Sequence, residues 1–96
     1  MVKVRWTQRA ADDLEQIHNY ITQQSPHFAS VEILKILDCE KLIRDHPNSG
    51  RIVPEIDNAN IREIIKGSYS VIYSCEEAGC VSILTVFHSS RSLKGI

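Results

Sequence analysis

Three side chains of this sequence have types that perform acid–base chemistry and bind anions. Glu55 follows Pro54 in a loop-like segment, Arg62 begins a strand-like segment, and His88 ends the last apolar segment. A carboxylate, a guanidinium and an imidazole could act together as base, phosphate clamp and acid in cleaving RNA. Each also has a simpler interpretation: a solvated loop carboxylate, a cross-strand ion pair and a polar residue at a sheet edge.

Further cations accompany these three. Arg51 follows Gly50 and could bind a phosphate or carboxylate through two hydrogen bonds. Arg91 and Lys94 are the only charges in the last ten residues, so the tail is basic. The four histidines do not fall at metal-ligand spacings, and there is no glycine-rich phosphate loop. The sequence therefore predicts an anion-binding or acidic-protein-binding surface, with neither a metal nor a cofactor.

The bulk composition bounds the protein class. The 96 residues form one predicted domain over 1–96, with 43% hydrophobic and 24% charged residues. Eleven basic and twelve acidic side chains give a net charge of −1, so no direct DNA binding is expected. Three cysteines, without a signal peptide, indicate reduced thiols and a cytoplasmic protein, although Cys75 and Cys80 flank a predicted turn and could pair. No apolar run approaches the ~20 residues that cross a membrane.

The first half of the chain reads as a strand and two helices. Val2 to Trp6 alternates as a half-buried strand. Thr7 is a suitable N-cap for a helix that ends near Gln24, and Ser25-Pro26 begins a second helix that extends to Arg44. Apolar residues, including Leu34 and Leu37, occur on more than one side of the second helix. This pattern fits either burial between the first helix and a sheet or a surface kept for a partner.

The second half reads as a meander of three strands. Residues 51–60 are predicted to be irregular, and strands are predicted over 61–66, 69–75 and 81–88. Gly67-Ser68 gives a two-residue hairpin turn with glycine first. The predicted class is α+β, with the order strand, helix, helix, strand, strand, strand. A helical hairpin should pack on one face of a small antiparallel sheet whose edge is joined by the first strand.

Nearly the whole chain resembles the RelE/ParE superfamily of bacterial toxins from toxin–antitoxin pairs, including plasmid stabilisation toxins. No single motif is specific, but the order and spacing of the matching residues are. These residues are Trp6, Thr7, Ala10, Asp13, Leu14, Ile17, Tyr20, Ile21, Pro47, Gly50, Arg51, Pro54, Glu55, Arg62, Gly67, Tyr69, Ile72, Tyr73, Ile83, Val86, His88 and Arg91. The resemblance implies a toxin that a cognate antitoxin holds inactive.

The superfamily has two branches with different targets. RelE-like members cleave messenger RNA in the ribosome, whereas ParE-like members inhibit DNA gyrase without being nucleases. The long helical hairpin resembles ParE. RNA-cleaving members usually carry an arginine where this chain has Ser70, and some carry a tyrosine where it has Ser89. Many ParE-like members also carry an arginine at the Ser70 position, so its absence weakens the nuclease hypothesis without establishing gyrase as the target.

Three hypotheses follow from the resemblance. The first is a non-enzymatic gyrase inhibitor, with Arg91 and Lys94 facing the target. The second is a ribosome-dependent endoribonuclease that uses Glu55, Arg62 and His88. The third is a non-toxic module that only binds an antitoxin. In each, the antitoxin tail is expected to contact a surface containing four residues, namely Arg51, Arg62, Leu34 and Leu37.

Overall fold

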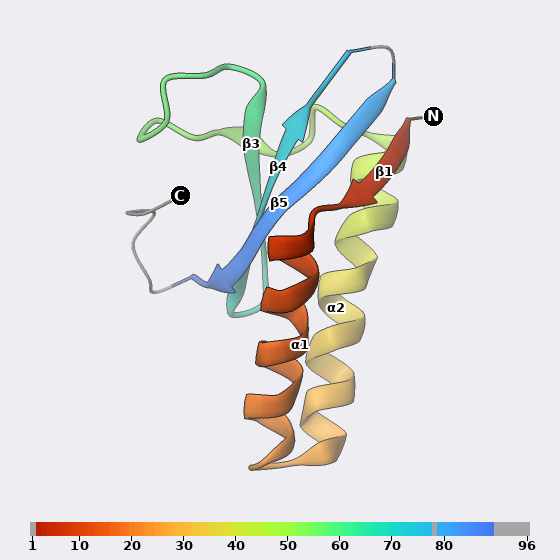
Figure 1. The fold of residues 1–96 in the computed structure, drawn as a ribbon, viewed down its shortest axis with the longest axis vertical. Helices are drawn as coiled ribbons and strands as arrows, with labels where there is room; N and C mark the ends of the chain where they lie inside the picture. Colours follow the sequence, from red (N-terminus) through yellow and green to blue (C-terminus); the bar gives the residue numbers. More distant parts are fainter. Residues whose placement is uncertain (1, 78, 90–96) are drawn as a thin grey trace.

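The computed structural model describes residues 2–77 and 79–89, which form two helices and a five-stranded sheet. The elements are β1 (Lys3–Trp6), α1 (Gln8–Thr22), α2 (Pro26–Asp45), β2 (Arg51–Ile52), β3 (Ile61–Lys66), β4 (Tyr69–Cys75) and β5 (Cys80–His88). The two helices lie side by side on one face of the sheet (Figure 1). The predicted α+β class and the helical hairpin are confirmed.

Local signals in the sequence explain where the helices begin. The Thr7 hydroxyl accepts a hydrogen bond from the Ala10 amide at 3.2 Å, and the Ser25 hydroxyl accepts one from the Phe28 amide at 3.1 Å. Pro26 occupies the first turn of α2, where its missing N–H leaves no helical bond unmade. Helix α1 ends two residues before the predicted Gln24, and α2 extends one residue past Arg44.

The sheet differs from the prediction in two respects. Its strand order is β1-β5-β4-β3-β2, and β1 runs parallel to β5, so the sheet is mixed rather than wholly antiparallel. The antiparallel helices return the chain to the end of the sheet where β1 begins, so β3 starts there (Figure 1). The chain then reverses direction twice, between β3 and β4 and between β4 and β5, so β5 runs in the same direction as β1. The second difference is β2, which pairs with β3 inside the segment predicted to be irregular.

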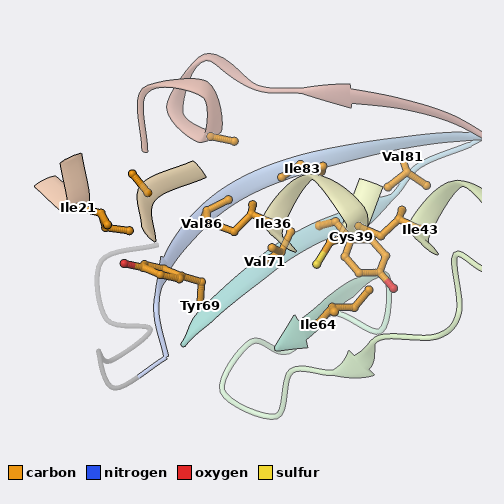
Figure 2. Packing of buried hydrophobic residues seen from close by; sticks show 13 residues of the cluster. Ile21, Ile36, Cys39, Ile43, Ile64, Tyr69, Val71, Val81, Ile83 and Val86 are labelled. Carbon is orange, nitrogen blue, oxygen red and sulfur yellow. The ribbon is translucent and has the colours of Figure 1, made fainter. Parts of the chain in front are cut away.

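The hydrophobic core lies between the helices and the near face of the sheet (Figure 2). Tyr69, Val71 and Tyr73 alternate along β4 toward the helices, as the period of two requires. Residues Ser70 and Ile72 point to the opposite face and are also buried. Tyr69 and Tyr73 are therefore packing residues of the core. No helix among residues 2–77 and 79–89 is long and apolar enough to cross a membrane.

Candidate functional site

The three candidate catalytic side chains do not come together. Arg62 pairs with Tyr73 near the start of β3, whereas His88 pairs with Tyr69, which pairs in turn with Lys66 at the other end of β3. Lys66 is four residues beyond Arg62, or about 13 Å along the strand, and β5 is two strands away. Glu55 is exposed in the β2–β3 loop at the Arg62 end of the sheet. His88 therefore lies far from both partners that acid–base cleavage would require.

Arg62 serves the structure of a loop. Its Nη1 donates hydrogen bonds to the carbonyl oxygen of Gly50 at 2.8 Å and to that of Asn48 at 3.3 Å. Its side chain is half-buried on the helix-facing side of the sheet, opposite Tyr73. These contacts orient the guanidinium toward backbone carbonyls. The simpler interpretation of Arg62, a cross-strand ion pair, is not seen among the described residues, and the neighbouring acid, Glu63, pairs with Arg51.

Tyr73 bonds to the same loop from its buried position on β4. Its phenol oxygen accepts a hydrogen bond from the Gly50 amide at 2.9 Å and donates one to the Pro47 carbonyl at 2.8 Å. The tyrosine is fully buried, and the Pro47 carbonyl also accepts a hydrogen bond from the Cys75 thiol at 3.7 Å. Tyr73 and Arg62 thus both bond to the backbone of the segment from Pro47 to Gly50. Pro47 and Gly50 are residue types typical of a loop, but they do not indicate these partners.

The buried phenol predicts a loss of stability at alkaline pH. Burial raises the pKa of Tyr73 above its usual value, and the Gly50 amide and the Arg62 charge oppose that rise. An unfolded tyrosine loses its proton near pH 10, before the folded one does. The stability that the protonated phenol of Tyr73 contributes should therefore be fully present below about pH 10. Above that pH the free energy of unfolding should fall, by at most about 1.4 kcal/mol per pH unit.

The Tyr73→Phe variant separates the effect of Tyr73 ionisation on stability from the effects of other titrating groups. The free energy of unfolding would be measured in urea between pH 8 and 11 for both proteins. We expect the steeper alkaline slope only in the parent chain. Equal slopes would mean that Tyr73 ionisation does not govern stability in this range.

Arg51 already has an intramolecular partner. Its Nε lies 2.7 Å and its Nη2 2.5 Å from Oε1 of Glu63, the residue opposite it on β3. The Glu63 side chain is only 5% exposed, whereas that of Arg51 is 53% exposed. Both contacts use one carboxylate oxygen, so the guanidinium keeps donors that face solvent. Arg51 can therefore hold Glu63 and still meet an acidic group from outside.

The second helix has both a core side and an exposed apolar side. Its buried residues include Ala29, Ile36, Cys39 and Ile43, which pack into the core. Leu34 and Leu37 remain 62% and 41% exposed, respectively. The structure confirms burial of one side of this broad apolar distribution within the monomer and leaves another side exposed, so a surface for a partner stays a prediction.

The two edges of the sheet are protected unequally. Beyond the end of β1, the Asp13 carboxylate accepts hydrogen bonds from the Thr85 hydroxyl at 2.6 Å and from the Val86 amide at 3.1 Å. Thr7 likewise donates to the Ile83 carbonyl at 2.9 Å. On the opposite side, β2 covers β3 only at residues 62 and 63, so no described strand pairs with the outer edge of residues 64–66. That edge could accept an added strand.

The remaining predicted site residues lie elsewhere. Arg91 and Lys94 are outside the residues that the structure describes. Within the described ranges, no cluster of His, Cys, Asp and Glu could hold a metal ion. Cys75 and Cys80 are free thiols. Cys75 pairs with Val81, so the adjacent Cys80 points to the opposite face, and the two sulfurs do not meet across the turn.

Sequence and structure comparisons identify relatives of the whole chain. Residues 4–93 match the model of the family described as the ParE toxin of the type II toxin–antitoxin system parDE. Toxin RelE2 of Caulobacter vibrioides is 32% identical over 91 residues, covering 95% of this chain and 99% of that protein.

Two solved structures share the fold at 22% sequence identity. A chain of the chromosomal ParDE system of P. aeruginosa superposes with a TM-score of 0.74, covering 92% of this chain and 96% of the other. A chain of the RelBE2 toxin–antitoxin complex of Mycobacterium tuberculosis gives a TM-score of 0.61, covering 91% and 96%. With its helical hairpin and five-stranded sheet, the chain belongs to the ParE family of toxins from type II toxin–antitoxin systems.

Proposed function

We propose that this toxin inhibits DNA gyrase as a binding protein, without cleaving RNA, and that a cognate antitoxin neutralises it. The observation that carries the proposal is the separation of His88 from Glu55 and Arg62 at opposite ends of the sheet. A general acid and a base must lie within hydrogen-bond reach of one substrate to act together. These three side chains do not meet that condition.

Ser70 supports the same proposal. The position where RNA-cleaving relatives usually carry a phosphate-binding arginine is here a serine that is almost fully buried. A buried hydroxyl cannot supply the charge that stabilises a phosphoryl transition state, a loss of about a hundredfold or more in rate. Basic residues of the tail, Arg91 and Lys94, remain the proposed contacts to the target.

One observation favours the alternative of a ribosome-dependent endoribonuclease. The chain is similar to a toxin named RelE2 and shares its fold with a RelBE2 complex. In that case Glu55, Arg62 and His88 would have to act on separate parts of the substrate. A third alternative, a non-toxic module that only binds an antitoxin, predicts harmless expression of the chain alone.

The antitoxin is proposed to contact the exposed side of α2 and the open edge of the sheet. Leu34 and Leu37 offer exposed apolar area on α2, and Arg51 offers guanidinium donors beside β3. Arg62 is the weaker candidate of the predicted set because its Nη1 is already bonded to two carbonyls. An amphipathic, partly acidic tail that folds on binding would suit this combination.

Controlled expression without antitoxin tests the choice of target. We expect filamentous cells, an induced DNA-damage response, intact messenger RNA and inhibition of supercoiling by purified gyrase. The Arg91→Ala/Lys94→Ala double variant should lose most toxicity, whereas His88→Ala should retain it. Messenger RNA cut at codon boundaries, and left intact by His88→Ala, would establish the nuclease alternative. Full toxicity of the double variant would exclude the tail as the contact.

A further inference from the structure

The turn between β3 and β4 packs against α2. Gly67 has a φ of +60°, and a Cβ placed on it would lie 3.7 Å from both Glu32 Oε1 and Lys35 Cδ. The same turn holds the end of β5, because the Ser89 amide donates a hydrogen bond to the Ser68 carbonyl at 2.8 Å. Contacts therefore run from α2 through the turn to the last described residue of the chain.

Glu32 brings a buried charge to this contact. It is 5% exposed, and no hydrogen bond from the described residues reaches its Oε2. The ammonium of Lys35 lies 3.2 Å from that oxygen, and the Lys35 side chain is 47% exposed. A buried carboxylate without a compensating cation is strongly destabilising. The cation that stabilises Glu32 is thus accessible from solvent, while Glu32 itself is not.

The end of β5 also packs against the residue that follows the turn. The rings of Tyr69 and His88 meet edge to face, with their centroids 5.5 Å apart. Tyr69 is buried, so its position is set by the core and by the turn that precedes it. A displacement of Gly67 and Ser68 would therefore move two of the groups that contact the end of β5, namely the Ser68 carbonyl and the Tyr69 ring.

We infer that the Glu32–Lys35 pair is a positioning element that couples the exposed surface of α2 to the strand end carrying His88. An acidic group of a bound partner that pairs with Lys35 withdraws the cation from Glu32. The uncompensated carboxylate then turns toward water and displaces the turn, which loosens the Ser89 hydrogen bond. This coupling is reciprocal: the factor by which the bound partner shifts the opening equilibrium of the strand end is also the factor by which opening the strand end changes the affinity for the partner. The inference rests on the proposed function only in taking the antitoxin as that partner.

Amide hydrogen exchange tests the inference in the complete chain, without any toxicity measurement. Lys35→Met removes the cation but keeps most of the apolar stem, so exchange of the Ser89 amide should accelerate about tenfold or more. The Glu32→Gln/Lys35→Met double variant has no buried charge to compensate, so its Ser89 exchange should return to within about threefold of the parent.

Two controls distinguish local positioning from a general loss of stability. The Thr7 amide, bonded to the Ile83 carbonyl, reports on β5 where it pairs with β1 and should be unaffected by Lys35→Met. Glu40→Gln makes the same substitution on α2 at a carboxylate bonded to Trp6 and Arg44, and should leave Ser89 exchange unchanged.

Unchanged Ser89 exchange in Lys35→Met, or equal acceleration at Thr7, would overturn the inference. If Lys35→Met does not fold, Lys35→Gln removes the same charge and is judged by the same criteria. If the parent chain fails to inhibit gyrase but the exchange pattern is as expected, that result would count against the proposed function alone.

Discussion

The Leu34→Glu/Leu37→Glu double variant should bind the cognate antitoxin at least about a hundredfold more weakly than the parent. Both side chains are exposed on α2, and placing carboxylates there would remove apolar contact and repel an acidic tail. A hundredfold change corresponds to about 2.7 kcal/mol. Because neither leucine is in the core, the free energy of unfolding should change by less than about 0.5 kcal/mol. Titration calorimetry with the antitoxin, and urea denaturation without it, would measure the two quantities.

Leu42 supplies a matched control on the same helix. Leu37 and Leu42 are both 41% exposed, yet the step of five residues from one to the other turns the side chain about 140° around the helix axis. Leu42→Glu should therefore reduce affinity far less than Leu37→Glu. Equal losses from the two single variants would contradict the proposed contact surface, and unchanged affinity of the double variant would exclude it.

Gly50→Ala should destabilise the fold by about 2–3 kcal/mol and lower the melting temperature by roughly 10 °C or more. A Cβ on Gly50 would lie 2.6 Å from the phenol oxygen of Tyr73 and 2.9 Å from the carbonyl oxygen of Glu63. The tyrosine is fully buried, and Glu63 lies in β3 between two paired strands. Neither neighbour can move without breaking hydrogen bonds of the loop or the sheet.

Gly79→Ala provides the comparison for this prediction. Gly79 has a φ of +74°, but a Cβ there would meet no atom of the described residues within 4 Å. Its replacement carries only the conformational penalty of a left-handed residue, about 1–2 kcal/mol. Thermal unfolding of both variants should give the larger loss for Gly50→Ala. A Gly50→Ala protein as stable as the parent would mean that the loop can move away from Tyr73.

The element order could be predicted because its signals are local. Thr7 and Ser25-Pro26 mark the helix starts, and Gly67-Ser68 marks a turn, within a few residues of the structures that they produce. The candidate site could not be predicted in this way. Arg62 has the same chemistry whether it binds a phosphate or the Gly50 carbonyl, and only the fold decides which partner is near.

Contacts between residues that are far apart in the sequence could not be predicted either. Asp13 and Thr85 are separated by 72 positions, and nothing near either residue indicates that α1 closes the free edge of β5. The burial of Glu32 also depends on the β3–β4 turn reaching α2. The sequence analysis did not identify the contacts of Asp13 or of Glu32, although Asp13 was among the residues that carry the family resemblance.

By itself, the sequence determined the helical hairpin and the three-strand meander, because periodicity, caps and turns act over a few residues. The toxin family followed from a resemblance that extends over nearly the whole chain. The tertiary structure decided that β1 runs parallel to β5, that Arg62 and Tyr73 hold a loop, and that His88 lies apart from Glu55 and Arg62. Strand direction and register are set by how the whole chain packs. A residue's chemical role follows from that register, since one strand position changes the face and a few positions change the partner.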